Sequence, residues 1–171
     1  LIAQVIPARD TRLPGDEDPP EGVELVALLE DPMRLALPAA HPLAHSPAVG
    51  LEQLRGEPWV QTSATSGCAR HVVRSCHTAG FEPRVAFESD DYQTVQGLVA
   101  AGVGVALIPR LALWTQRADI AVCDLAPAAP ARLLAAALPA AARLVPSAPA
   151  MLGVLEGVCS GPLASPRVTP A

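Results

Sequence analysis

Apolar and polar positions follow strand-like and helix-like patterns through the middle of the chain. Short apolar runs at residues 58–61, 84–88 and 103–108 favour strands. Between these runs, apolar residues recur at helical spacing over residues 68–79 and 92–101, and a glycine follows each of the two segments. This central part therefore predicts two successive β–α–β crossovers and hence an open parallel α/β sheet.

The flanking parts predict further strands and loops. An apolar run at residues 1–6 favours a buried strand, and the proline-rich, acidic residues 7–22 favour an exposed loop. Two β-rich runs at 23–30 and 33–38 are separated by Asp31-Pro32, which predicts a break between them. The remaining expected elements are helical turns over 51–54 and 111–114, strands over 120–125 and 132–138, a linker over 126–130, a helix over 149–158 and a disordered tail over 159–171.

Two polar loops follow the first two central strands. In open α/β sheets, ligands bind beyond the carboxyl ends of the strands, beside the N-termini of helices. The first loop offers hydroxyls and free backbone N–H groups at a helix start, which favour a carboxylate or another anion. The second offers an apolar wall and a hydroxyl. The candidate ligand-binding residues are Gln61, Thr62, Ser63, Thr65, Ser66, Phe87, Ser89 and Asp90.

Helix capping is the alternative role for these polar side chains. Thr65 or Ser66 would cap the first helix. The second helix would be capped from the cluster Ser89-Asp90-Asp91, with Ser89 or Asp90 as the cap if these residues do not bind a ligand. Capping would account for any single hydroxyl, whereas two such loops at one edge of a sheet favour a site for a small ligand.

The amino-acid composition indicates a folded chain with a hydrophobic core and excludes several classes of protein. Half of the 171 residues are hydrophobic and only 17% are charged, which excludes a disordered chain. Aromatic residues make up 3%, so Ala, Val and Leu must build the core, with Trp59 as an anchor. No apolar stretch is long enough to span a membrane. The net charge is −5, lysine is absent and the arginines are scattered, so this chain is not expected to bind nucleic acid directly.

No catalytic or metal-binding constellation is visible, so no enzyme activity, metal or cofactor is expected. His71 and His77 lie six residues apart on a predicted helix, which does not match a metal-binding pair. The four cysteines are too widely spaced for a zinc site and are expected to be reduced thiols, with redox sensing by Cys68 at a helix start as the alternative. Gly102-Val103-Gly104 lies between a helix and a strand, which favours a tight turn over a phosphate-binding loop.

Five motifs, in this order, resemble a known family. They are LLEDPMRLALP at residues 28–38, His41-Pro42-Leu43-Ala44, Leu51-x-x-Leu54 with Glu57-Pro58-Trp59-Val60, Ala79-Gly80-Phe81-x-Pro83, and VAAGVGVALIP at residues 99–109. Together they resemble the C-terminal effector-binding domain of the LysR-type transcriptional regulators over about residues 23–158.

The resemblance implies an α/β fold of the type 2 periplasmic-binding-protein kind, with two lobes and a small effector in the cleft between them. Residues 1–36 and 126–158 would belong to lobe I, and residues 37–125 would form a complete lobe II. Two crossover strands would form a hinge. The family's helix-turn-helix and the first half of lobe I have no counterpart, and the chain begins with Leu. We therefore expect an N-terminally truncated chain with an incomplete first lobe, which would make the isolated chain poorly soluble.

The expected function is that of the effector-sensing domain of a bacterial, cytoplasmic regulator. The resemblance implies an anionic or aromatic-acid effector, with residues 61–66 and 87–90 matching the family's cleft-lining loops. It also implies a dimer or tetramer in the full-length protein, contact with DNA only through a missing N-terminal helix-turn-helix, and no membrane association. The alternatives are a solute-binding protein of an uptake system with the same fold and an enzyme built on it. The upstream coding sequence would distinguish the first two.

Overall fold

The computed structural model describes residues 6–7, 21–139 and 146–161. The chain divides into two compact units, which are described separately: Leu1–Asp31 with Arg132–Ala171, and Pro32–Ala131. The expected lobe boundaries lie about five residues away, at 36/37 and 125/126. The assignment of the two units to regulatory lobes stays a prediction.

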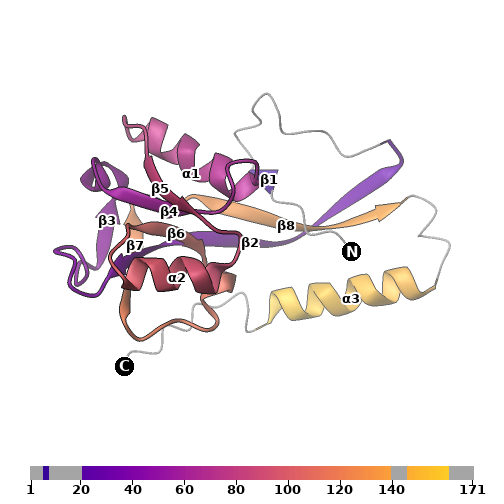
Figure 1. The fold of residues 1–171 in the computed structure, drawn as a ribbon. Coiled ribbons are helices and arrows are strands. Elements are labelled where there is room, and N and C mark those ends of the chain that lie inside the picture. Colours follow the sequence, from indigo (N-terminus) through magenta and orange to yellow (C-terminus); the bar gives the residue numbers. More distant parts are fainter. Residues whose placement is uncertain (1–5, 8–20, 140–145, 162–171) are drawn as a thin grey trace. The chain divides into compact units, whose positions relative to one another are not determined.

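The second unit contains most of the secondary structure (Figure 1). It takes in the second half of strand β2 (Val23–Pro38) and then a series of short elements. These are β3 (Ala48–Gly50), η1 (Leu51–Leu54), β4 (Pro58–Gln61), α1 (Gly67–Thr78), β5 (Arg84–Glu88), α2 (Tyr92–Ala100), β6 (Ala106–Pro109), η2 (Arg110–Leu113) and β7 (Ile120–Ala126). The central strands and helices lie where the hydrophobic pattern predicts them, within three residues at their ends.

The first predicted crossover is confirmed, because β4 and β5 pair in parallel with α1 between them. A parallel bridge between Trp59 and Val105 brings the chain just before β6 alongside β4. The three strands of the predicted segment are thus parallel, but strands from outside it join in the antiparallel sense, so the sheet is mixed. β6 pairs antiparallel with β2, β7 also pairs antiparallel with β2, and β3 pairs in parallel with β7. The antiparallel partner β2 lies about 70 residues upstream of β6, so no local pattern could identify it.

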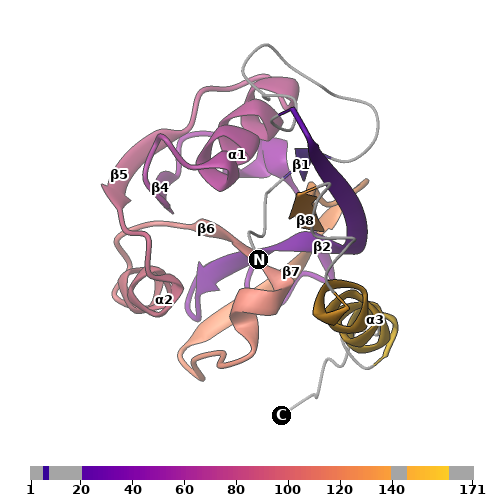
Figure 2. The ribbon, with the colours of Figure 1, turned by 90° about the vertical axis from the view of Figure 1, so that its right-hand side faces the viewer.

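Two hydrophobic clusters occupy opposite faces of these strands. Alternation along β2 places Leu35 in one cluster and Ala36 in the other, and on β4 it separates Trp59 from Val60 in the same way. The first cluster includes residues of α1 and the second residues of α2. Figures 1 and 2 show the two helices on opposite sides of β4 and β6. This arrangement holds the end of β4 between two helix-covered faces. As expected, Trp59 is a core anchor with no exposed surface, and its ring centroid lies 6.3 Å from that of Phe81.

The predicted break at Asp31-Pro32 is wrong, because β2 runs unbroken from Val23 to Pro38. A proline restricts the residue before it to extended conformations, and this preference suits a strand as well as a turn. Asp31 has no exposed surface, and its carboxylate accepts a hydrogen bond of 2.9 Å from Nε of Arg132. Met33 donates its N–H to the carbonyl of Pro130 at 2.7 Å, so β2 remains hydrogen-bonded directly after the proline.

The first unit contains the first half of β2, β8 (Ala131–Pro139), α3 (Ser147–Ser160) and β1 (Ile6–Pro7). β1 pairs antiparallel with β8, with Ile6 opposite Leu133. The predicted strand and helix at 132–138 and 149–158 are confirmed by β8 and α3. Most of the expected first strand (1–5), of the acidic loop (8–20) and of the tail (162–171) lies outside the described residues.

Candidate functional site

The first polar loop connects β4 to α1 and caps the helix. Ser66 Oγ accepts a hydrogen bond of 3.0 Å from the backbone N–H of Ala69, so Ser66 is the N-cap. Its hydroxyl also lies 2.6 Å from Thr62 Oγ1, while Ser63 Oγ lies 3.1 Å from Thr65 Oγ1. The capping role of Ser66 is thus confirmed, and the other hydroxyls pair within the loop.

The second polar loop connects β5 to α2, and the predicted cap cluster of residues 89–91 supplies the cap. Within it Asp91, rather than Ser89 or Asp90, accepts hydrogen bonds from the N–H groups of Gln93 and Thr94 and from Thr94 Oγ1. These bonds, those from Thr94 foremost, hold the pKa of the Asp91 carboxyl below its usual value. Because α2 begins at Tyr92, the residue directly before it takes the cap. The Asp91-x-x-Thr94 spacing is the signal that could have chosen Asp91 within the cluster.

Backbone hydrogen bonds and side chains join the two loops. The N–H of Ser89 donates to the carbonyl of Gln61 at 2.9 Å, which extends the β4–β5 pairing to the strand ends. The N–H of Ser63 donates to Asp90 Oδ1 at 2.9 Å. The N–H of Ala64 donates to Glu88 Oε2 at 3.2 Å. Sequence reasoning missed Glu88, because it was assigned only as the last residue of a strand.

These contacts change the chemistry expected of the first loop. The backbone N–H groups of Ser63 and Ala64 were expected to be free for an anionic ligand, but two carboxylates of the second loop accept them. The neighbouring positive charge is Arg70 on α1, whose Nη1 donates to the carbonyl of Thr65 at 2.6 Å. The joined strand ends therefore combine two carboxylates of the second loop with the hydroxyls of the first loop and Arg70 at the start of α1.

Gln61 and Phe87 differ sharply in burial. Gln61, the last residue of β4, is 6% exposed, and its Nε2 lies 3.5 Å from Glu88 Oε1. Its Oε1 is buried and accepts no hydrogen bond within the described part of the chain. Phe87 is 49% exposed, so its ring lies on the surface of β5 as an accessible apolar contact.

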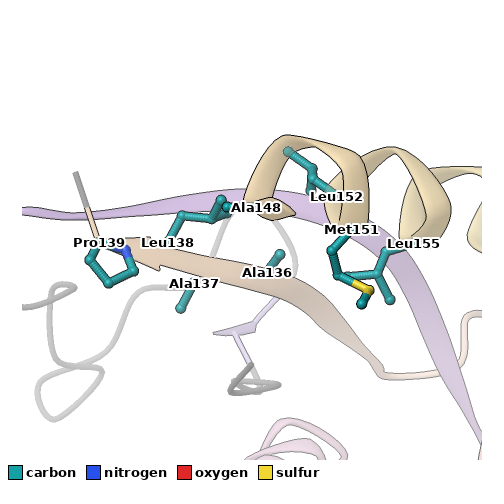
Figure 3. Close-up of a pocket in the computed structure, with 8 residues that line it drawn as sticks. All are labelled: Ala136, Ala137, Leu138, Pro139, Ala148, Met151, Leu152 and Leu155. Carbon is teal, nitrogen blue, oxygen red and sulfur yellow. The ribbon is translucent and has the colours of Figure 1, made fainter. Parts of the chain in front are cut away.

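A separate apolar cavity of about 140 Å³ lies in the first unit between β8 and α3 (Figure 3). All of its lining residues are apolar: Ala136, Ala137, Leu138, Pro139, Ala148, Met151, Leu152 and Leu155. It presents no charged or hydroxyl side chain to orient a carboxylate. The joined loops of the second unit therefore remain the better candidate for a polar ligand.

Two of the cysteines are buried thiols with raised pKa values, and redox sensing by Cys68 stays a prediction. Burial, with the charge of Glu82, raises the pKa of the Cys76 thiol to about 12, and burial also raises the pKa of Cys123. The described residues contain no group of three or more His, Cys, Asp or Glu that could hold a metal ion. Among the described helices, none is long and apolar enough to cross a membrane.

The fold has the local geometry of a ligand-binding α/β domain. β4 and β5 are parallel strands whose carboxyl ends lie beside helix starts, where open α/β sheets bind ligands. The family model of the LysR substrate binding domain matches residues 11–160, and the chain belongs to this family. The predicted family and fold class are both confirmed.

Curated relatives of this chain are named as transcriptional regulators. It is 36% identical over 80 residues to the HTH-type transcriptional regulator AlsR of Bacillus subtilis, which covers 46% of this chain and 26% of that protein. It is 40% identical over 95 residues to the HTH-type transcriptional regulator CatR of Pseudomonas putida, which covers 54% of this chain and 32% of that protein. The chain thus spans about a quarter to a third of these relatives.

Solved structures with the same fold are LysR-type regulatory domains. The CcmR regulatory domain of Synechocystis, in complex with 2-PG, has a TM-score of 0.74 at 21% identity, and the match covers 85% of this chain and 71% of that one. The C-terminal domain of a probable LysR family regulator from Rhodococcus has a TM-score of 0.68 at 27% identity, covering 82% and 70%.

Proposed function

We propose that this chain is the effector-sensing domain of a bacterial transcriptional regulator, with its effector bound at the joined loops of residues 61–66 and 87–90. The observation that carries the proposal is the meeting of the two loops through Ser89 with Gln61 and Ser63 with Asp90. This meeting puts the polar groups of both loops at one strand end, directly before the N-terminus of α1. Such a position suits a small ligand in an open α/β sheet.

The ligand class that we propose is a small carboxylic acid, aromatic or aliphatic. The start of α1 carries a partial positive charge from the helix dipole, and Arg70 adds a full charge close to Thr65. Hydroxyls of Thr62, Ser63 and Thr65 can donate to a carboxylate once their present pairings open. The exposed ring of Phe87 offers an apolar contact for an aromatic or aliphatic body. A structural neighbour, the Synechocystis regulatory domain, is in complex with 2-PG.

Regulation would follow if the effector binds two conformations of the protein with unequal affinity. An effector that binds one arrangement of the two units more tightly shifts the population toward it, and an oligomer can pass that shift to DNA-binding domains. We propose that the protein acts in the cytoplasm as a homodimer or homotetramer and contacts DNA through a helix-turn-helix outside these 171 residues. The names of its curated relatives favour this regulator over a solute-binding protein or an enzyme.

The proposal is tested on the protein expressed from its own gene. A library of small carboxylic acids is screened by thermal shift, and hits are measured by calorimetry. Ser63→Ala combined with Ser89→Ala is expected to weaken the binding of a hit several-fold and to reduce its effect on the promoter. The matched control is Thr78→Ala, which removes a hydroxyl at the other end of α1 that donates only to Arg74 O. If no acid binds and the double variant leaves the promoter response unchanged, the proposal is wrong.

A further inference from the structure

The chain passes between its two compact units twice, each time inside a strand. The first passage lies between Asp31 and Pro32 in β2, and the second lies between Ala131 and Arg132 in β8. β2 and β8 are hydrogen-bonded neighbours in the sheet, so the junction is a two-stranded ribbon. Movements between domains are absorbed by a few residues where the domains join, and contacts between the two strands therefore restrict such movements here.

Prolines weaken the backbone ladder of this ribbon. Pro32 directly follows the first passage and Pro130 precedes the second, and neither has an N–H group to donate. On the side of the second unit, the N–H of Met33 still donates to the carbonyl of Pro130 at 2.7 Å. On the side of the first unit, a contact between side chains, that of Arg132 with Asp31, joins the two strands.

Asp31 is a buried charge that the candidate effector site does not use. It has no exposed surface, and its Oδ2 lies 2.9 Å from Nε of Arg132, whose side chain is 16% exposed. Asp31 is also the first buried residue of β2, since residues 23–30 are half-buried or exposed. Burying two charges costs so much desolvation that two apolar side chains are often at least as stable in their place. A buried ion pair is therefore better suited to fixing one arrangement of its strands than to adding stability.

We propose that Asp31 and Arg132 form an electrostatic clamp, which fixes the geometry of the β2–β8 ribbon and so restricts the orientation of one unit relative to the other. The regulatory role of the clamp rests on the proposed function. All residues of the candidate effector site lie in the second unit, and the ribbon is the covalent path from there to the first unit. A clamped ribbon couples the two units, whereas a loose ribbon lets each take up orientations independently of the other.

A stable variant without the two charges distinguishes a clamp from an ion pair that only stabilises the fold. Asp31→Leu combined with Arg132→Met, the apolar variant, replaces both charges by apolar side chains and should keep a free energy of unfolding close to that of the wild type. Asp31→Asn is the second variant, because it removes one charge but keeps an oxygen that can accept the N–H of Arg132. Both are made in the protein expressed from its own gene.

Spin labels measure the orientation of the units by pulsed electron paramagnetic resonance. Thr78→Cys on α1 and Glu156→Cys on α3 place one label on each unit, at exposed positions. Cys68→Ser and Cys159→Ser remove the partly exposed native thiols. An excess of unlabelled protein restricts the measurement to distances within one chain. Thr78→Cys with Gln116→Cys gives a pair of labels inside the second unit.

The width of the distance distribution is the result that tests the clamp. In the apolar variant and in Asp31→Asn, we expect the distribution between the units to be at least twice as wide as in the wild type, and the distribution within the second unit to stay unchanged. Asp124→Asn is the matched control, because it removes the charge that pairs with Arg34 of β2 at 3.0 Å inside the second unit. Wild-type widths in both clamp variants would overturn the proposal, and so would equal broadening in Asp124→Asn.

The promoter provides a second readout, which separates the clamp from the function on which its role rests. In the apolar variant, the Kd of an acid found in the library screen should change little, because the candidate site lies within the second unit. The effect of that acid on the promoter should fall by at least half. An unchanged promoter response would overturn the regulatory role of the clamp. If no acid binds, the proposed function fails, and the distance distributions still decide whether the clamp exists.

Discussion

Replacing Gly104 by alanine should push the segment directly before β6 away from β4 and destabilise the chain. Gly104 is buried, and a methyl group built on it would lie 2.4 Å from the carbonyl oxygen of Pro58 and 3.2 Å from the nitrogen of Trp59. Both of these atoms are backbone, so neither can turn aside as a flexible side chain would. Carbon–oxygen contacts in proteins normally begin at about 3.3 Å, so the two segments must move apart by about 1 Å.

The cost follows from two hydrogen bonds that this movement would break. The N–H of Val105 donates to the carbonyl of Pro58 at 2.8 Å, and the N–H of Val60 donates to the carbonyl of Val105 at 2.9 Å. Both valines are 1% exposed, so water cannot replace the lost partners. A net loss of about 1 kcal/mol per bond, with a further desolvation cost for each orphaned group, amounts to roughly 2–4 kcal/mol. The thermal midpoint should fall by about 4–16 °C.

A second glycine provides a control of opposite sign. Gly97 lies inside α2, and a methyl group added there would have nothing within 4 Å, so Gly97→Ala should stabilise the helix by about 0.5–1 kcal/mol. Urea unfolding, followed by circular dichroism, measures the wild type and both variants under one condition. A Gly104→Ala chain as stable as the wild type would refute the reasoning, and so would a Gly97→Ala chain that loses as much as Gly104→Ala.

Three further outcomes are expected. Hydrogen bonds lower the pKa of Asp91, so the stabilisation by this cap is complete above the unfolded pKa of 3.8 and is lost as pH falls through the lower folded pKa. In Asp91→Asn the thermal midpoint should therefore fall less between about pH 5 and pH 3 than in the wild type, and an equal fall in both proteins would contradict this. Arg132→Met leaves the fully buried carboxylate of Asp31 without its guanidinium partner, which should lower the free energy of unfolding in urea by about 3–5 kcal/mol. Adding Asp31→Leu to Arg132→Met should restore most of this loss. Cys76, buried and with its pKa raised to about 12, should resist a thiol reagent at about pH 8 that labels the partly exposed Cys68, and rapid native labelling of Cys76 would show that this part of the core opens.

Several of the short motifs that identified the family have direct structural causes. In the His41-Pro42-Leu43-Ala44 element, His41 Nδ1 accepts the N–H of Leu43 at 3.1 Å, and its Nε2 lies 3.5 Å from Glu57, directly before β4. In the glycine-containing element after α2, Gly102 takes a φ of +77° to end the helix, and Gly104 permits the close approach to β4. These interactions join residues close in sequence or need one residue type, so a sequence can display them.

Interactions between distant residues account for most of the expectations that were wrong. The pairing of β6 with β2 depends on which strand reaches the open edge of β6, and neither strand carries that information locally. The Asp31-Pro32 dipeptide reads as a break until Arg132, about 100 residues away, supplies a partner for the buried carboxylate. The sequence predicted a cap of α2 within residues 89–91 but could not choose among them, because all three residue types can serve as caps.

The amino-acid sequence by itself determined the family, the order of the central strands and helices, and the two loops that form the candidate site. Hydrophobic periodicity, glycines that end helices and capping residues act over a few positions, so they can be recognised in the sequence alone. Only the tertiary structure decided that Glu88 and Asp90 accept the N–H groups of Ser63 and Ala64, and that an oxygen of Gln61 is buried without a partner among the described residues. The charge and hydrogen-bonding capacity of a site depend on which groups have already paired across the fold. Here that pairing occupies two N–H groups that the sequence left free for an anion and adds two carboxylates to the candidate site.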